Sequence, residues 1–450
     1  MEHPPLRSSV TPHRRLVKGI AEGLTRGPWR VEALAKTLGD LTGRRGGWRL
    51  PLARRLIGEF GEGPRPITAK VARFLGQDTG LARVNGRQRL HLVGALTGPP
   101  VMWPTPGAPE AWDVPVIVTP VDLARFLGLE PPELDGFADL QGRARGARSG
   151  ASRHYDYVWR ARASSTARLI EAPRFRLKQV QRLLLEAILA RIPTHEAAHG
   201  FCPGRSIATF AAPHVGRPFV LTMDLRDFFP SVRGAQVVAT FLTAGYPEPV
   251  ARRLAGICTN RVPREVWESC PNRGEGPAAW RAVRLSLAPH LPQGAPTSPV
   301  LANLAAHRLD ARLTGLAMVS DVRYTRYADD LAFSGGERFA RTWRRFATHV
   351  AATVLEEGFE VNHRKTRGMP QGVRQRVAGV VVNDHPNVSR DEVDRLKATL
   401  HNCLTRGPAS QNRDGHPNFR AHLAGRVAHV AMLNPDRGAA LRSVLDQIDW

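Results

Sequence analysis

The sequence predicts an α+β fold, and three observations lead to that prediction. Near the N-terminus, apolar residues recur at helical spacing, as Val31, Leu34 and Leu38 do, which is the pattern of an amphipathic helix. From residue 155 onward, short apolar runs of strand length alternate with helical patterns. After residue 389 helical patterns continue to the C-terminus. Strands are therefore expected only in the middle of the chain.

The N-terminal part, residues 1–150, is predicted to be a basic helical extension. A second helical pattern, Leu52, Leu56 and Phe60, follows the first one. A connector rich in Pro and Gly then spans residues 98–109, a composition typical of a boundary or an extended strap. We therefore expect a small helical region followed by a linker.

Two short helices are predicted after this connector. Thr119 is a good N-cap and Pro120 fits the first helical position, and a second short helix is expected over Pro131–Ala138. Helix pairs of this kind occur in DNA-reading helix-turn-helix domains, although packed pairs without that role are commoner. A basic stretch over 141–153 ends the N-terminal part.

Beyond residue 155, the predicted elements are set by apolar periodicity and by turn and cap residues. They are the strand Arg168–Pro173, the helix Leu177–Ile192, the strand Phe219–Asp224, the loop Leu291–Pro299 with Ser298 as N-cap of the next helix, the two strands within Tyr324–Ser334, the strand Phe359–Asn362, the apolar run Val377–Val382, a helix opened by a Ser389–Glu392 capping box, and helices near 421–433 and 438–448.

The composition favours a polyanionic partner. The chain has 450 residues, 42% of them hydrophobic, and its 64 Lys and Arg against 40 Asp and Glu give a formal charge of +24. Such an excess of positive charge favours nucleic acid. Four scattered cysteines form no metal-binding or disulfide pattern, and no apolar run is long enough for a membrane helix. We therefore expect a cytoplasmic protein with no membrane association.

Three carboxylates are the candidate catalytic groups. Asp224 ends a predicted strand, and Asp329 and Asp330 lie at the tip of a predicted strand–turn–strand unit. Nucleotidyl transfer uses two divalent ions held by a few acids, and Mg²⁺ would neutralise neighbouring carboxylates while binding substrate phosphates. This requires the strand that ends at Asp224 to lie beside the hairpin. The alternative is two unrelated, solvated acidic turns.

Three motifs then occur in an order that resembles a bacterial reverse transcriptase over about residues 155–450. They are Asp224-Leu225-Arg226-Asp227-Phe228-Phe229-Pro230-Ser231-Val232, Pro292-Gln293-Gly294-Ala295-Pro296-Thr297-Ser298-Pro299 and Tyr327-Ala328-Asp329-Asp330. The resemblance implies a right-hand polymerase with fingers, a palm built on an antiparallel sheet and a helical thumb. It also implies an RNA-directed DNA polymerase that uses dNTPs, with residues 151–385 as fingers and palm and 386–450 as thumb.

The resemblance also implies a role for each matching residue. Asp224, Asp329 and Asp330, together with Leu225, would bind two Mg²⁺ ions. Phe229 would lie under the sugar of the incoming nucleotide, with Phe228 in the core beside it. The remaining implied residues are Gln293 and Gly294 in the nucleotide pocket, Arg168 on the triphosphate with Arg162 or Arg160 as a second cation, and Lys365 as proton donor to the leaving pyrophosphate.

Within reverse transcriptases, the sequence is most similar to the retron type and its myxobacterial branch. The similarity lies in His199-Gly200-Phe201, Gly204-Arg205-Ser206, Ala211-Ala212-Pro213-His214, Val377-Ala378-Gly379 and Trp112-Asp113-Val114-Pro115. Phe210 and Ala378 depart from the common retron pattern, which has Asn and Thr there. These departures concern recognition of the primer RNA rather than polymerisation.

A retron enzyme would copy part of a structured non-coding RNA, priming from the 2′-hydroxyl of an internal guanosine. Its product would be RNA-linked, multicopy single-stranded DNA, and the template strand would be held as an RNA–DNA hybrid. The family also implies anti-phage defence with an effector protein. The alternatives are a non-retron defence or intron-derived reverse transcriptase that uses a 3′ end or a protein primer, and an inactive RNA-binding scaffold.

Overall fold

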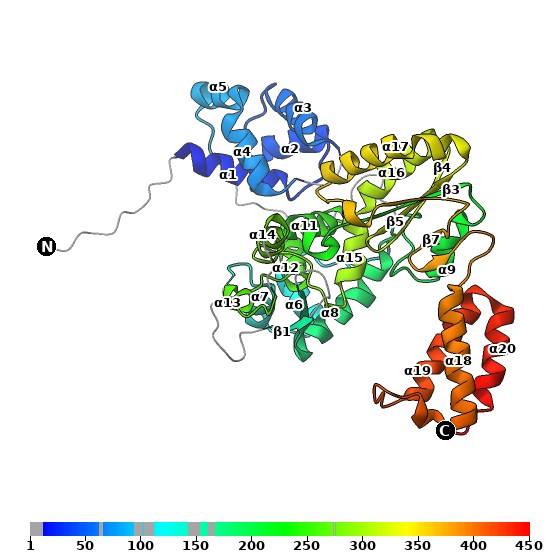
Figure 1. Cartoon of the computed structure of the whole chain (residues 1–450). Coiled ribbons are helices and arrows are strands. Elements are labelled where there is room, and N and C mark those ends of the chain that lie inside the picture. Colours follow the sequence, from blue (N-terminus) through cyan, green and yellow to red (C-terminus); the bar gives the residue numbers. More distant parts are fainter. Residues whose placement is uncertain are drawn as a thin grey trace. The chain divides into compact units, whose positions relative to one another are not determined.

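The structure is a computed structural model that describes residues 12–62, 66–93, 102, 112–142, 154–160, 167–272, 274 and 276–450. The chain forms two compact units, Met1–Pro193 with Val232–Leu301, and Thr194–Ser231 with Ala302–Trp450. These two units are defined by how compactly the chain packs. The boundaries predicted at residues 150 and 385 divide the chain by the family resemblance, and they stay a prediction. Figure 1 labels the elements.

The first unit begins with five helices around one apolar core. They are α1 (Pro12–Leu24), α2 (Val31–Thr42), α3 (Arg49–Phe60), α4 (Thr68–Gln77) and α5 (Thr79–Gln88). Leu34, Leu38, Leu52 and Leu56 are buried in this core, so the periodic residues in the sequence do mark the inner faces of α2 and α3. Nearly all of the predicted connector 98–109 lies outside the described residues, as does most of the basic stretch 141–153.

The two short helices predicted next are present, as α6 (Pro120–Leu127) and α7 (Pro131–Ala138). The Thr119 hydroxyl accepts a hydrogen bond from the Asp122 amide, and the Asp122 carboxylate accepts one from the Thr119 amide. This reciprocal capping satisfies two amides at the helix start. The predicted N-cap of α6 is therefore confirmed.

The rest of the first unit combines a two-stranded antiparallel sheet with helices. Its elements are β1 (Tyr155–Arg160), β2 (Arg168–Pro173), α8 (Phe175–Ala187), η2 (Leu189–Arg191), α11 (Gly234–Thr243), α12 (Glu248–Cys258), α13 (Arg264–Glu268) and α14 (Pro277–Ser286), and the unit ends within α15 (Ser298–Ala305). The predicted strand Arg168–Pro173 is confirmed as β2. Helix α8 starts at Phe175 and ends earlier than predicted, with a 3₁₀ turn replacing its last part.

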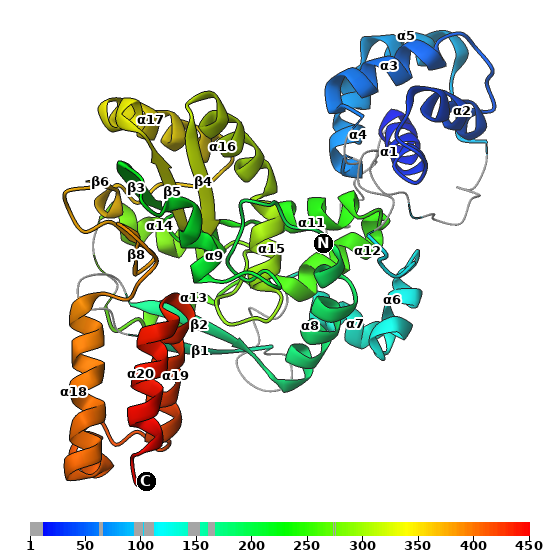
Figure 2. The ribbon, with the colours of Figure 1, turned by 90° about the vertical axis from the view of Figure 1, so that its right-hand side faces the viewer.

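The second unit is built on a four-stranded antiparallel sheet in the order β4-β5-β3-β6. The strands are β3 (Phe219–Asp224), β4 (Val322–Tyr327), β5 (Asp330–Gly335) and β6 (Arg367–Pro370). Helices α16 (His307–Val319) and α17 (Glu337–Glu356) lie against one side of this sheet (Figure 2). Phe333 of β5 stacks on Tyr324 of β4 and meets Phe346 of α17 edge-on, so aromatic packing fixes α17 on the sheet.

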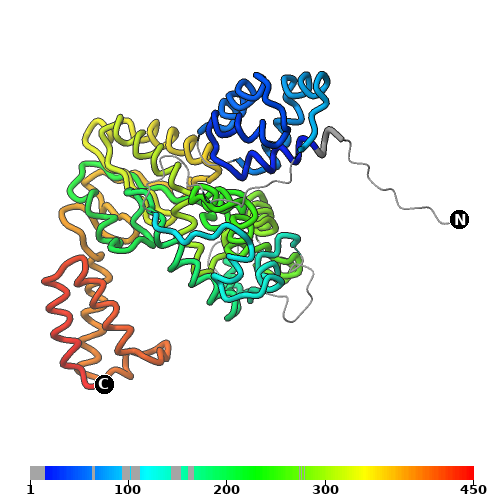
Figure 3. Tube along the Cα trace, turned by 180° about the vertical axis from the view of Figure 1, so that it is seen from behind, coloured from blue at the N-terminus to red at the C-terminus, as the bar shows by residue number. Residues whose placement is uncertain are grey.

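One buried apolar cluster extends from the other face of this sheet to the C-terminal helices. Val220 of β3 and Ala332 of β5 are buried in one cluster with Leu423 and Leu445. The other elements with residues in this cluster are α9 (Ile207–Ala211), β7 (Arg376–Val377), β8 (Val380–Val381), α18 (Arg390–Arg406), α19 (Phe419–Leu433) and α20 (Pro435–Asp446). The 3₁₀ turns η3 (Ala212–His214) and η5 (Pro408–Ser410) follow α9 and α18. Helices α18, α19 and α20 lie side by side (Figure 3).

Three predicted local features differ from the structure. Residues 359–362 form no strand, and only Val361 makes an isolated bridge, to Leu225. Ser298 is the first residue of α15 instead of its N-cap, and its hydroxyl donates to the Pro292 carbonyl. Ser389 does precede α18, but its hydroxyl bonds the Glu392 carboxylate and caps no amide.

The chain is thus helix-rich with small antiparallel sheets, which agrees with the predicted α+β class. Within the described residues, no helix is both long enough and apolar enough to span a membrane.

Candidate active site

The catalytic candidates meet at one edge of the sheet in the second unit. Asp224, the last residue of β3, is paired directly with Asp330, the first residue of β5. Directly opposed residues of antiparallel strands project from the same face of a sheet. Asp329 lies in the two-residue turn before β5, and its carbonyl accepts a hydrogen bond from the Leu225 amide, 2.8 Å away. The predicted pairing of the Asp224 strand with the hairpin is confirmed.

The turn that precedes these acids has an unusual backbone. Ala328 adopts the left-handed conformation, with φ of 53°, which costs a non-glycine residue about 1 kcal/mol. Its carbonyl accepts a hydrogen bond of 3.0 Å from the Arg326 guanidinium. Arg326 is fully buried, so a fixed cation holds the turn that presents Asp329 and Asp330.

Burial and the neighbouring acids change the pKa of Asp330. Burial, and then repulsion from Asp329 and Asp224, raise the pKa of Asp330 to about 6, while Lys365 acts in the opposite direction. Crowded carboxylates resist ionisation unless positive charge is brought near them. The site is therefore a place where a cation would be stabilised.

Asp224 is held by two polar partners from one segment. The Asn362 side-chain amide donates to Oδ1 at 3.0 Å, and the Lys365 ammonium donates to Oδ2 at 2.7 Å. The Asn362 main-chain amide also donates to the Asp224 carbonyl, at 2.7 Å. Lys365 was predicted to lie near the site, whereas Asn362 was not. The only sequence signal for Asn362 was its position three residues before Lys365.

The chemistry of these donors fits a hard divalent cation. The three aspartates offer carboxylate oxygens, and Leu225 can offer only its main-chain carbonyl oxygen. Mg²⁺ prefers oxygen ligands of these kinds. In the part of the chain that the structure describes, no three His, Cys, Asp or Glu side chains are already gathered as a metal cage. Lys365 instead supplies positive charge at Asp224. A cation bound by Asp224 would have to displace or share that contact.

Phe229 lies on the short helix α10 (Phe228–Ser231) and is half-buried. Its ring centroid is 5.8 Å from that of Phe228 and 6.1 Å from that of Phe201. Phe228 itself is buried against Phe359 and lies under the Arg326 guanidinium. The predicted core role of Phe228 is confirmed, and Phe229 keeps a partly open ring beside it.

The other predicted nucleotide residues lie in the first unit, along β2. The Gln293 carbonyl accepts a hydrogen bond of 2.8 Å from the Glu171 amide. Gly294 has φ of 135°, and a Cβ there would lie 2.8 Å from the Glu171 carbonyl oxygen. Only glycine fits such a position. Gln293 and Gly294 are thus fixed against the strand that begins with Arg168.

Arg168 has a second cation beside it. It is paired across the β1–β2 sheet with Arg160, and both are exposed. Like charges in directly opposed positions repel each other, so an anion would stabilise the pair. Of the two alternatives for the second cation, Arg160 is found opposite Arg168. Arg162 lies outside the described residues.

A buried polar cluster behind Gly294 was not predicted from the sequence. Glu171 accepts hydrogen bonds from His290, at 2.9 Å, and from the Asn260 side chain, at 2.7 Å. Burial lowers the pKa of His290, but attraction to Glu171 outweighs it, so the pKa is raised overall. Because the partners lie far apart in the sequence, no local pattern indicates this cluster.

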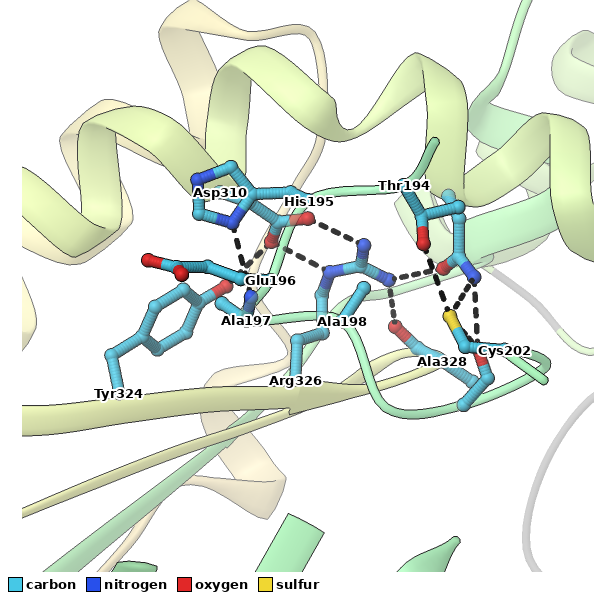
Figure 4. A network of polar contacts seen from close by, with 12 residues as sticks. Thr194, His195, Glu196, Ala197, Ala198, Cys202, Asp310, Tyr324, Arg326 and Ala328 are labelled. Atoms are coloured by element: carbon cyan, nitrogen blue, oxygen red, sulfur yellow. Dashed lines mark hydrogen bonds and ion pairs between the residues drawn. The ribbon is translucent and has the colours of Figure 1, made fainter. Parts of the chain in front are cut away.

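A second unpredicted network surrounds Arg326 (Figure 4). Its guanidinium forms a two-pronged ion pair with Asp310 of α16, at 2.8 and 2.6 Å, and donates to the side-chain oxygen Oδ1 of Asn303 at 2.9 Å. All three side chains are fully buried. The Arg326 main chain also pairs with Ala197 and His199. The network therefore joins the hairpin that carries Asp329 and Asp330 to the segment 197–202.

Comparison with known proteins finds reverse transcriptases, both as a family model and as individual relatives. Residues 160–382 match the family model described as reverse transcriptase (RNA-dependent DNA polymerase). The retron Mx65 reverse transcriptase of Myxococcus xanthus is 42% identical over 332 residues, which cover 73% of this chain and 72% of that protein. The retron Mx162 reverse transcriptase of the same organism is 34% identical, covering 79% and 75%. The retron Ec86 reverse transcriptase of Escherichia coli is 30% identical, covering 53% and 65%.

Proposed function

Because this chain belongs to the retron reverse transcriptases and is an RNA-directed DNA polymerase, we propose that it copies part of a structured non-coding RNA into DNA. In this proposal the 2′-hydroxyl of an internal guanosine is the primer, so the multicopy single-stranded DNA remains linked to the RNA. The family implies a right-hand polymerase fold, with which the antiparallel sheets and the many helices are compatible. We assign fingers and palm to residues 151–385 and the thumb to 386–450.

The observation that supports polymerase chemistry most directly is the cross-strand pairing of Asp224 with Asp330 beside Asp329. We assign the binding of two Mg²⁺ ions to these three carboxylates and the Leu225 carbonyl. When bound, such ions supply activation of the attacking hydroxyl and stabilisation of the leaving pyrophosphate. The chain itself contributes a rigid hairpin that holds two of the acids, and Asn362, which orients the third.

The roles of the substrate-binding residues belong to the same proposal. Phe229 would contact the sugar and exclude a ribose 2′-hydroxyl. Gln293 and Gly294 would line the nucleotide pocket, supported by the close approach of Gly294 to β2. Arg168 would bind the triphosphate, with Arg160 as the second cation, supported by their direct pairing.

Lys365 would donate a proton to the leaving pyrophosphate, a role supported by its contact with Asp224. Its ammonium is mostly exposed and therefore able to leave this carboxylate for another oxygen. A protonated amine within reach of the reacting groups is a suitable general acid.

The nucleic-acid partners follow from charge and family. A formal charge of +24 favours a phosphate-rich ligand, and an A-form RNA–DNA hybrid is recognised mainly through its backbone and 2′-hydroxyls. We assign the hybrid to the thumb helices α18, α19 and α20. Anti-phage defence, an effector partner and a cytoplasmic location are parts of the proposal that family membership supports.

Polymerisation is tested with purified protein, a primed RNA template, dNTPs and Mg²⁺. We expect DNA synthesis that is lost in Asp329→Ala and Asp330→Ala. Undiminished DNA synthesis in these variants would overturn the assignment of the acids. If the native protein incorporated no nucleotide, the alternative of an inactive RNA-binding scaffold would be favoured.

Phe229→Ala and Phe229→Val should raise ribonucleotide use relative to dNTPs, and an unchanged ratio would assign sugar selection to another residue.

The retron product needs a separate experiment. Nucleic acid from cells that carry the locus should contain a small DNA whose mobility changes after ribonuclease or debranching treatment. A DNA that is not linked to RNA would favour the alternatives with a 3′-end or protein primer. The same treatment of cells that express Asp329→Ala controls for unrelated DNA.

A further inference from the structure

Phe201 combines exposure with an unfavourable backbone. Its side chain is 44% exposed, although burying an aromatic ring is strongly favourable. Its φ is +60°, in the left-handed region that bulky residues rarely occupy. The surrounding structure must therefore hold Phe201 in this conformation, and residues held in this way cluster at functional sites.

The ring of Phe201 lies between two elements of the candidate active site. Its centroid is 6.1 Å from that of Phe229 and 6.5 Å from that of Tyr327. Tyr327 directly precedes the turn that presents Asp329, and Phe229 is the residue assigned to the sugar. Phe201 is the exposed member of this aromatic trio, whereas the other two rings are half-buried.

Buried groups fix the backbone on which Phe201 stands. A Cβ on Gly200 would lie 2.6 Å from the Ala328 amide nitrogen, so the two turns are in direct contact. The Gly200 carbonyl accepts a hydrogen bond of 2.8 Å from the buried Asn303 side chain, which also binds Arg326. Figure 4 shows this segment beside the Arg326 network. The exposed ring is therefore placed by the same network that holds the catalytic turn.

We propose that Phe201 is a second specificity residue of the nucleotide pocket, whose exposed ring contacts the sugar and base of the incoming nucleotide beside Phe229. An aromatic ring suits both the apolar face of a deoxyribose and the π-face of a base. The proposal rests on the function assigned above to Phe229. It adds a contact from a segment remote in sequence from all three polymerase motifs.

The test compares Phe201→Ala, Phe201→Gly and Phe201→Tyr in single-nucleotide incorporation on an ordinary primed RNA template. Loss of the ring should raise KM for dNTP about tenfold with a smaller change in kcat, and should raise the use of ribonucleotides. Glycine adopts the left-handed conformation without strain, whereas alanine does not. An equally raised KM in Phe201→Gly and Phe201→Ala would therefore assign the effect to loss of the ring and not to backbone strain. Phe201→Tyr should restore the native KM.

Phe175→Ala is the matched control, because this ring is 76% exposed on α8 and has no assigned contact with substrate. It should leave KM and sugar selection unchanged. Unchanged KM and selectivity in both Phe201→Ala and Phe201→Gly would overturn the proposal. So would a raised KM for primer–template alone, which would place the ring on the nucleic acid already bound. A change in Phe229→Ala without one in Phe201→Ala would reject Phe201 and keep the proposed function.

Discussion

Lys365 donates a hydrogen bond to the catalytic candidate Asp224, with Nζ 2.7 Å from Oδ2. This contact places the ammonium where a divalent cation would also be attracted. It also opposes the rise in the pKa of Asp330. Lys365 therefore affects the charge balance of the acids, in addition to the proton transfer proposed for it.

Replacing Lys365 with Met should separate these effects. We expect kcat to fall about a hundredfold, the usual effect of removing a general acid. The Mg²⁺ concentration for half-maximal rate should fall, because the acids lose a competing positive charge. Steady-state assays across a Mg²⁺ titration measure both. Lys36→Met, an exposed lysine on α2, is the control, and an unchanged kcat in Lys365→Met would remove Lys365 from the chemistry.

Asp330→Asn should stabilise the protein near neutral pH when divalent ions are chelated. The folded-state pKa of Asp330 is raised, from 3.8 to about 6, so the folded state binds this proton more tightly than the unfolded state. The aspartate therefore destabilises the fold as pH rises between these values, by about 3 kcal/mol at most. Urea unfolding at pH 7 should show the gain in Asp330→Asn, and the gain should disappear near pH 4.

An equal stability difference between Asp330→Asn and the native chain at both pH values would contradict this account. The Asn variant keeps the shape of the side chain and removes only the charge, so altered packing contributes little. Polymerase activity of Asp330→Asn should be lost at every pH. Stability and activity therefore change in opposite directions at this residue.

Arg326→Met should destabilise the chain strongly. The guanidinium and the Asp310 carboxylate are fully buried, and removal of one partner leaves the other charge buried and uncompensated, at a cost of about 3–5 kcal/mol. Chemical denaturation measures the loss. Arg326→Met combined with Asp310→Leu should recover part of it. Arg390→Met, which breaks an exposed pair with Asp394, should cost less than about 1 kcal/mol.

Gly294→Ala should raise KM for dNTP and lower stability. The added Cβ would meet the Glu171 carbonyl oxygen at 2.8 Å, and φ of 135° excludes an ordinary side chain. The loop must move away from β2, taking Gln293 with it. Gly425→Ala is the control, since its Cβ would meet nothing within 4 Å and alanine favours the helix. A native KM in Gly294→Ala would show that this loop tolerates movement.

The strands that carry the candidate acids could be predicted because their signals are local. The apolar run that ends at Asp224 and the hairpin at Asp329 each have strand length and a polar end, and the register of β3 with β5 places the acids as expected. The inner faces of α2 and α3 were predictable for the same reason. The strand predicted over 359–362 from the length of the run was wrong. This segment of mixed apolar and charged residues makes only one isolated β-bridge.

The supporting networks could not be predicted, because each depends on which distant elements pack together. In the sequence, Arg326 has the position of a solvent-facing residue in an alternating strand. In the structure it instead forms an ion pair with Asp310 of α16. Glu171 similarly depends on His290, far along the chain. Ser389 had the right sequence for a capping box, yet its hydroxyl bonds the Glu392 carboxylate. Partner choice of this kind is a property of the tertiary structure.

The buried cluster of the C-terminal helices is continuous with that of the sheet, and this bears on how the chain can be divided. Leu423 and Leu445 share a buried cluster with Val220 and Ala332 of the catalytic sheet. A fragment that ends near residue 385 would cut through this cluster and remove Leu423 and Leu445 with the helices that carry them. The region assigned to the hybrid is thus continuous in its apolar packing with the sheet that carries the candidate acids, and exchanging it between related enzymes would interrupt that packing.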